Sequence, residues 1–127
     1  MDIYYLAIGD ELLKGETLEG NGHTLAQFLA SRGLELSTIR VLSDEPSALN
    51  ETLGELSTKP GLLILSGGLG PTDDDRTRQA VAEACGVPLI QSDAALKSLK
   101  RWAAIRGRPL GSHNLRQADI PEGAQLL

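Results

Sequence analysis

Hydrophobic residues form short runs along the chain that predict β-strands. The first run covers 3–8 and stops at Gly9, and the last covers 62–65 and continues into Ser66. Between them, residues 35–42 alternate in the two-residue pattern of an extended segment. Continuous apolar runs are typical of strands buried on both faces, as in a parallel sheet. We therefore predict three strands at these positions.

Between and after these runs, apolar residues recur at the three- to four-residue spacing of helices. This spacing predicts helices with apolar positions in 25–30, 49–56, 80–84 and 96–105. Pro46, preceded by Ser43, is typical of a helix start, and Asp93 is a candidate N-cap for the last helix. C-terminal caps are predicted at the glycines that follow helical segments, namely Gly33, Gly86 and Gly107.

Strands that alternate with helices predict an α/β fold, in which right-handed connections place helices on both faces of a mostly parallel sheet. The 127 residues suffice for one domain, which we expect to span 1–127. Residues 124–127 look like the start of a strand, so we expect the chain to be part of a longer protein. Trp102 is expected to face the core and Cys85 to be a buried thiol.

Composition and charge narrow the classes of function. The net charge of −5 and the pI near 4.9 argue against binding nucleic acid through a broad basic surface, and 3% aromatic residues leave few rings to stack on bases. One cysteine excludes an intramolecular disulfide and a cysteine-based zinc cluster. No apolar run approaches the length needed to span a bilayer, and the first residues do not resemble a secretory signal. We expect a cytoplasmic protein that acts on a small molecule, without nucleic-acid or membrane partners.

Charge is distributed unevenly along the chain. Residues 1–75 carry 4 basic and 13 acidic side chains, a balance of −9, whereas residues 76–127 carry 8 basic and 4 acidic ones, a balance of +4. An acidic cluster beside a basic half suits a site for a metal ion and phosphate. Two solvated faces of opposite sign would give the same totals, so the charges alone leave both interpretations open.

Residues 66–77 carry the strongest indication of a binding site. Their three glycines let the backbone approach a ligand closely, and the backbone amides can form an anion-binding nest. The helix that follows would direct its positive N-terminal dipole at the same point. Asp73, Asp74 and Asp75 could place a divalent cation between this loop and a phosphate. The alternative is structural, because aspartate near a helix N-terminus is stabilising without any metal.

Three loops are expected to converge at the carboxyl ends of the parallel strands, after Gly9, at 43–44 and after Ser66. Two common phosphate-binding motifs are missing. No Gly-Lys-Ser/Thr ends a glycine-rich loop, and the main glycine loop follows the third strand where a dinucleotide fingerprint follows the first. Two polar residues have structural explanations that remain open. Glu11 could form an ion pair with Lys14. His113 could be a solvated loop residue, and the alternative is a general base.

Taken together, several motifs resemble the N-terminal domain of CinA-type competence/damage-inducible proteins, within the molybdopterin-binding (MoaB/Mog-like) fold family. The matching residues are 9–13, Gly15, Asn21, 66–74, Asn114, 117–118 and 121–124. The resemblance covers essentially the whole chain and implies a three-layer α/β sandwich. The wider family has Gly-Gly-Thr-Gly followed by Arg-Asp. Here Leu69 replaces the threonine and Asp74 replaces the arginine, which favours the CinA branch over pterin-phosphate recognition.

The resemblance implies a metal-dependent pyrophosphatase that hydrolyses the diphosphate of ADP-ribose or a related nucleotide, joined in longer relatives to a C-terminal nicotinamide-nucleotide amidase domain. One alternative is a module that binds molybdopterin or its nucleotide without turnover, and another is an oligomerisation or regulatory domain. We expect a homo-oligomer.

The site that follows from this hypothesis contains a divalent cation, either Mg²⁺, Mn²⁺ or Co²⁺. Asp75 would hold it, with Asp44 or Asp10 as partner. Asp74 and Arg76 are the other candidate catalytic residues. Phosphate and nucleotide contacts are expected from Gly9, Asn21, Ser66, Gly67, Gly68, Gly70, Thr72, Asn114 and Arg116.

Overall fold

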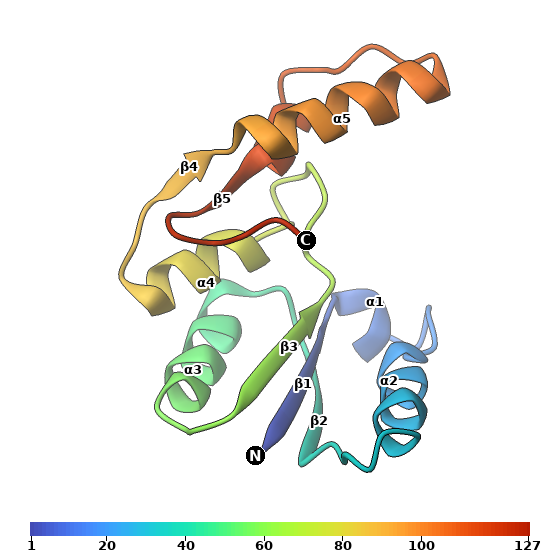
Figure 1. The fold of residues 1–127 in the computed structure, drawn as a ribbon, viewed down its shortest axis with the longest axis vertical. Coiled ribbons are helices and arrows are strands. Elements are labelled where there is room, and N and C mark those ends of the chain that lie inside the picture. Colours follow the sequence, from blue (N-terminus) through green and yellow to red (C-terminus); the bar gives the residue numbers. More distant parts are fainter.

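A three-stranded parallel sheet lies at the centre of the fold (Figure 1). The computed structural model describes residues 1–127. Strand β1 (Ile3–Ile8) is flanked by β2 (Thr38–Leu42) on one side and β3 (Leu62–Ser66) on the other. Every residue of β1 except Tyr4 is buried, as the apolar run predicted. Both predicted flanking strands and the parallel arrangement are confirmed.

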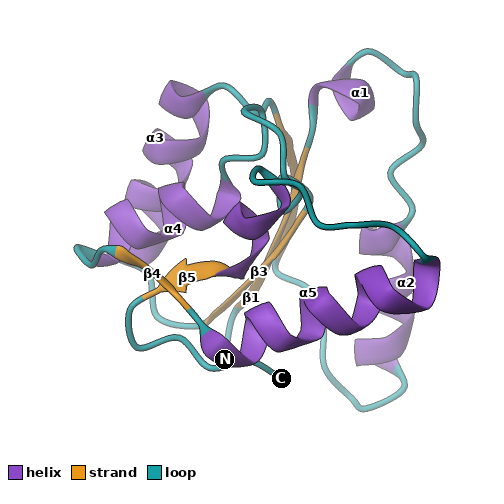
Figure 2. Cartoon of the chain, turned by 90° about the horizontal axis from the view of Figure 1, so that it is seen from above, coloured by secondary structure: helices purple, strands orange, loops and turns teal.

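Helices cover both faces of this sheet. Helix α2 (Asn21–Ala30) lies on one face, and α3 (Pro46–Ser57) and α4 (Thr77–Cys85) lie together on the other. Figure 2 shows β1 and β3 running obliquely between these two layers, with α3 and α4 on one side and α2 on the other. The predicted α/β sandwich is therefore confirmed. None of the helices combines the length and hydrophobicity needed to cross a bilayer.

A second, two-stranded antiparallel sheet lies beyond the carboxyl ends of the three strands (Figure 1). It pairs β4 (Leu89–Gln91) with β5 (Asp119–Pro121). The long helix α5 (Asp93–Arg106) and the 3₁₀ helix η1 (Asn114–Ala118) connect the two strands. The loop between β3 and α4 thus runs between the main sheet and this second unit.

The main core forms where the sheet meets α3 and α4. Leu6 and Ile8 of β1 pack against the predicted helical stripe of Leu49, Leu53 and Leu56. Leu49 is 0% exposed, and full burial of a leucine side chain contributes about 1.5–3 kcal/mol. Because this core anchors the ends of β1 and the start of α4, it also fixes the loops that leave them.

The structure corrects several local predictions in the first half of the chain. Strand β2 begins at Thr38, because the preceding Ser37 forms two hydrogen bonds with Ile3. The Oγ atom of Ser37 accepts from the N–H of Ile3, and the N–H of Ser37 donates to the carbonyl oxygen of Ile3. A short helix, α1 (Asp10–Leu13), forms where a loop was expected. Helix α2 ends at Ala30 with Ser31 as its C-cap, and Gly33, in the left-handed conformation with φ +73°, closes the turn that follows by donating its N–H to the carbonyl oxygen of Ala30.

The C-terminal part contains more corrections. The three-residue strands β4 and β5 and the helix η1 were not predicted, and residues 124–127 form no strand. Ser92, and not Asp93, caps α5 by accepting a hydrogen bond from the amide of Ala95 at 3.2 Å. Trp102 is 44% exposed and Cys85 is exposed, so neither is buried as expected. Gly86 and Gly107 do cap α4 and α5 in the left-handed conformation.

Candidate functional site

The carboxyl ends of β1 and β3 form a crevice because the chain leaves these neighbouring strands in opposite directions. After β1 it continues to α2 on one face of the sheet, and after β3 it continues to α4 on the other. Such a topological switch point leaves a gap between the diverging loops, where α/β proteins bind ligands. The topology alone therefore places the candidate site at this edge.

A small, polar cavity of about 240 Å³ occupies this crevice, and we call it the acid pocket. All three loops that follow the parallel strands contribute to it, as the sequence predicted. Four of its side chains are carboxylates and none is a lysine, arginine or histidine. Its lining residues are Ile8, Gly9, Glu11, Asp44, Gly68, Thr72, Asp74 and Asp75.

The acid pocket concentrates negative charge around Asp44. Burial raises the pKa of Asp44, and the neighbouring carboxylates of Asp10, Asp74 and Glu11 raise it further. Asp10 differs, because a hydrogen bond from the hydroxyl of Ser43 at 2.7 Å lowers the pKa of its carboxyl and stabilises its charge. Like charges this close repel one another. A cation entering the pocket would relieve that repulsion.

The side chains of the acid pocket do not form a complete set of ligands for a metal ion. Nowhere in residues 1–127 do three histidine, cysteine, aspartate or glutamate side chains converge so that they could hold one ion together. Magnesium, however, commonly takes one or two protein carboxylates and completes its shell with water and phosphate oxygens. The donor set of the acid pocket therefore fits a hard cation that arrives with, or shares, an anionic ligand.

The loop between β3 and α4, residues 67–76, is called the glycine loop below. Gly67 has φ +88° and lies so close to β1 that a Cβ atom there would collide with the carbonyl oxygen of Ile8. Thr77, 3% exposed, donates its hydroxyl to the carbonyl oxygen of Gly67 at 2.8 Å and its N–H to that of Gly68 at 3.2 Å. These contacts hold the start of the loop against the end of β1.

Asp75 stabilises the far end of the glycine loop. Its Oδ2 atom accepts hydrogen bonds from both the amide and the hydroxyl of Thr72, at 2.9 and 2.8 Å. Burial raises the pKa of Asp75, but these hydrogen bonds outweigh it and lower the pKa overall. One oxygen of the predicted metal ligand is thus used inside the loop, which leaves Oδ1 for any ion.

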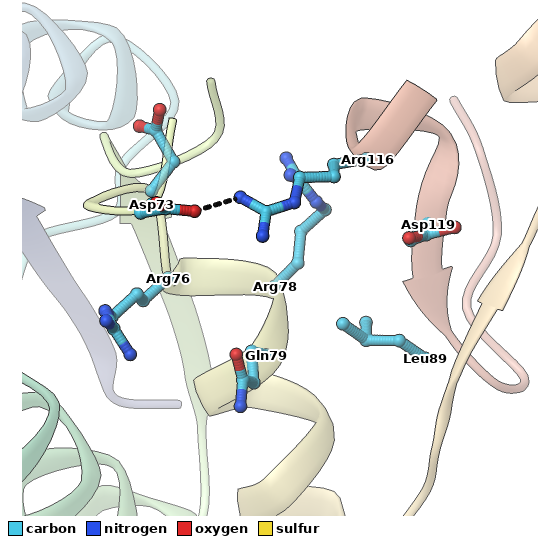
Figure 3. Close-up of a pocket in the computed structure, with 8 residues that line it drawn as sticks. Asp73, Arg76, Arg78, Gln79, Leu89, Arg116 and Asp119 are labelled. Carbon is cyan, nitrogen blue, oxygen red and sulfur yellow. Dashed lines mark hydrogen bonds and ion pairs between the residues drawn. The ribbon is translucent and has the colours of Figure 1, made fainter. Parts of the chain in front are cut away.

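A second cavity, of about 290 Å³, lies on the other side of the glycine loop, and we call it the arginine pocket (Figure 3). It lies between the start of α4 and the second sheet. Asp75 borders both pockets, so the two are separated only by the loop. The arginine pocket is lined by Asp73, Asp75, Arg76, Arg78, Gln79, Leu89, Arg116 and Asp119.

The predicted site residues fall into three groups. Those that line the acid pocket are Gly9, Asp44, Gly68, Thr72, Asp74 and Asp75. Arg76 and Arg116 line the arginine pocket instead. Those that line neither pocket are Asp10, Asn21, Ser66, Gly67, Gly70 and Asn114.

Several residues of the last group form hydrogen bonds with neighbouring residues that explain why they do not line a pocket. Ser66 hydrogen-bonds the hydroxyl of the buried Tyr5 at 2.6 Å, and that hydroxyl also donates to Glu19, which accepts the amide of Gly22 at the start of α2. Asn114 accepts the amide of Gly111 in a turn. These contacts orient loops around the crevice and do not reach into it.

Sequence reasoning missed three contributors to the site. Arg78 and Thr77 carry no motif of their own, although both lie within three residues of the aspartate run that drew attention to the loop. Glu11 was considered as a partner of Lys14, but no ion pair joins them and Glu11 lines the acid pocket. Its position directly after the first strand was the available signal.

Comparisons with known proteins agree with this architecture. Residues 4–113 match the family described as the probable molybdopterin binding domain. The chain is 43% identical over 122 residues to a CinA-like protein of Synechococcus sp. (strain RCC307), and 40% identical over 127 residues to one of Geobacter sulfurreducens. These matches cover 96% and 100% of this chain but only 29% and 31% of those proteins. The chain therefore spans less than a third of the relatives' length.

Solved structures give the same result. The protein CinA of Thermoplasma acidophilum, described as of unknown function, superposes with a TM-score of 0.85 at 27% identity, over 98% of this chain and 73% of that one. The molybdopterin biosynthesis enzyme MoaB of Thermus thermophilus superposes with a TM-score of 0.59 at 22% identity, over 90% and 70% of the two chains. The second likeness concerns the fold alone.

Proposed function

Because the chain belongs to the molybdopterin-binding domain family, in its CinA-like branch, we propose that its acid pocket binds a phosphorylated small molecule of the pterin or nucleotide class. The observation that carries this proposal is the composition of the pocket. Backbone from the glycine loop and four carboxylates meet at the switch point of the sheet. This combination suits a phosphate group bound together with a divalent cation.

The cation is needed because of the charge balance. Four carboxylates would repel a bare phosphate, whereas an ion held by Glu11, Asp44 or Asp74 would attract it. The cation supplies positive charge between the two anionic partners. Gly68 lets the backbone approach closely, and α4 directs its N-terminus towards the loop. Protein and ligand thus share the ion, which agrees with the lack of a complete protein ligand set.

Calorimetric titration tests this proposal. Molybdopterin and ADP-ribose are titrated separately into the protein, each with and without Mg²⁺. We expect binding of at least one ligand that requires the metal and that weakens about tenfold or more in Asp44→Asn. The matched control is Asp93→Asn, which removes one acidic charge at the exposed start of α5. Metal-independent binding, or equal loss in both variants, would contradict the proposal.

A second candidate function is hydrolysis of a nucleotide diphosphate, as the resemblance to CinA-type proteins implies. The specific observation in its favour is the excess of carboxylates, since binding alone needs only one or two of them. One or two of Glu11, Asp44 and Asp74 would hold the cation together with oxygens of the diphosphate, whose charge the cation would neutralise. Arg76 and Arg116 line the arginine pocket and do not line the acid pocket, where the cation would lie.

The hydrolytic candidate is tested by product formation. ADP-ribose is incubated with the protein and Mg²⁺, Mn²⁺ or Co²⁺, and AMP and ribose 5-phosphate are measured by chromatography. We expect turnover to fall at least a hundredfold in Asp74→Asn and to stay unchanged in Asp93→Asn. Metal-dependent binding without either product would leave the binding module as the function and reject the enzyme.

A further inference from the structure

The arginine pocket holds two guanidinium groups that belong to different parts of the fold. Arg78 comes from the first turn of α4, and Arg116 comes from η1 in the second unit. Figure 3 shows both side chains reaching into the same space, whereas Arg76 points away from Arg116. Arg76 also borders a separate small cavity beside α3. The pair that faces one common point is therefore Arg78 and Arg116.

Arg78 is fixed in place by the glycine loop. Its Nη1 donates to the carbonyl oxygen of Leu69 at 2.5 Å and its Nη2 to that of Gly70 at 3.2 Å. A guanidinium group has five N–H donors, so most of them stay available after these two bonds. Burial lowers the pKa of Arg78; Asp75 and Asp119 counteract that shift, and the nearby Arg116 adds to it. Two like charges therefore approach each other around this cavity.

Arg116 has a weaker partner. Its Nη1 lies 2.6 Å from Oδ1 of Asp73, and the two side chains are 52% and 85% exposed. Such exposed ion pairs contribute only about 0–1 kcal/mol. Arginine–phosphate pairs are charge-assisted and frequently bidentate, whereas Asp73 bonds Arg116 through one oxygen only. A phosphate group that enters the cavity can thus replace Asp73 on Arg116 at little cost.

The charge balance of the cavity agrees with this exchange. Its lining contains three arginines and three aspartates, which cancel. Asp75 is held by Thr72 and Asp119 belongs to β5, so Asp73 is the one acid on an exposed, singly bonded side chain. When Asp73 moves away, Arg78 and Arg116 balance Asp75 and Asp119, and Arg76, whose side chain points away from Arg116, adds one further positive charge to the lining. The pocket then has a positive excess, in contrast to the acid pocket.

We propose that the arginine pocket is a second anion site, which binds a phosphate group between Arg78 and Arg116 with Asp73 as the competing internal anion. The site is separate from the acid pocket and does not depend on the function proposed for it. Because Arg78 also bonds two carbonyl groups of the glycine loop, an anion here contacts a residue that holds the wall between the two pockets. The phosphate group is either free inorganic phosphate or part of a larger ligand.

Two substitutions of opposite expected sign test this site. Inorganic phosphate is titrated in the presence of EDTA, which removes the divalent cations that the acid pocket requires, and binding is followed by the Nε–H resonances of the arginines. Asp73→Asn removes the competitor and is expected to tighten phosphate binding three- to tenfold. Arg116→Gln removes a ligand and is expected to weaken binding at least tenfold.

Matched controls separate a local effect from net charge. Asp93→Asn changes the charge by the same amount as Asp73→Asn, and Arg108→Gln matches Arg116→Gln at an exposed position outside both pockets. Equal effects of the paired variants, or weakening by Asp73→Asn, would overturn the proposal. If AMP competes with inorganic phosphate, as followed by the same arginine resonances, the site is assigned to the phosphate group of a larger ligand. If AMP does not compete, the site is assigned to free phosphate. Failure of metal-dependent binding in the acid pocket leaves these results unaffected.

Discussion

The substitution Thr77→Val tests how the glycine loop is held. The hydroxyl of Thr77 is buried and is replaced by a methyl group of similar size, so the change removes one hydrogen bond, of 2.8 Å, to the carbonyl oxygen of Gly67. The hydrogen bond is part-buried and Gly67 itself is exposed, so the net cost of losing this bond is that of an ordinary intramolecular hydrogen bond, about 0.5–1.5 kcal/mol. We expect a net loss of about 0.5–1.5 kcal/mol in the free energy of unfolding.

Urea denaturation at 25 °C, followed by circular dichroism, measures this loss. Thr58→Val is the matched control, because its hydroxyl also donates to a carbonyl oxygen at 2.8 Å but lies at the exposed end of α3, where water can replace it. That variant is expected to lose less than about 0.5 kcal/mol. Thr77→Ser keeps the hydroxyl and should retain more stability than Thr77→Val. Equal stability of Thr77→Val and the wild-type protein would refute the role assigned to this contact.

Three further predictions concern stability and its dependence on pH. Burial and, next, neighbouring carboxylates raise the pKa of Asp44 in the folded state. The native protein therefore binds this proton more tightly than the unfolded chain and loses stability as pH rises through that pKa. Asp44→Asn is therefore expected to raise the melting temperature at pH 7 without divalent ions and to lose that advantage below the ordinary pKa of 3.8; a lower melting temperature at pH 7 would contradict this. Arg40 and Lys59 lower the pKa of Glu55 from 4.5 to about 2, so their stabilising effect is complete above pH 4.5 and is lost as pH falls towards 2. Glu55→Gln should flatten this part of an acid-unfolding curve, and an unchanged curve would count against the pair. Leu49→Ala opens a cavity in the main core and should cost about 2–5 kcal/mol in urea denaturation, whereas the same change at the exposed Leu18 should cost almost nothing.

The central sheet was predictable because its signals are strong and local. The apolar run of β1 is buried on both faces, and the stripe of Leu49, Leu53 and Leu56 forms the core as its spacing indicates. The second unit was not predictable in the same way. Strands β4 and β5 have three exposed or half-buried residues each, too few for any periodicity. Helical spacing also misled at Trp102, because its side of α5 borders an open apolar groove.

The position of the acid pocket was predictable from the sequence, because the carboxyl ends of parallel strands must lie together. That rule placed Gly9, Asp44 and the glycine loop at one edge without any knowledge of side-chain contacts. It could not divide the acidic and basic residues between two cavities. Asp73 and Arg116 are 43 positions apart, and only the packing of the second unit, through β5, against α4 brings them together. The structural role of Asp75 likewise depends on a turn geometry that its motif does not specify.

Paramagnetic broadening by Mn²⁺ tests the central claim most directly. A ¹H–¹⁵N correlation spectrum of the protein is recorded with substoichiometric Mn²⁺, with and without ADP-ribose. We predict that the amide signals of Glu11, Asp44 and Asp74 broaden first, that ADP-ribose strengthens this pattern, and that Asp44→Asn weakens it. Broadening centred on acids elsewhere, such as Glu55 or Asp93, with these three signals left sharp, would contradict a cation site at the switch point of the sheet.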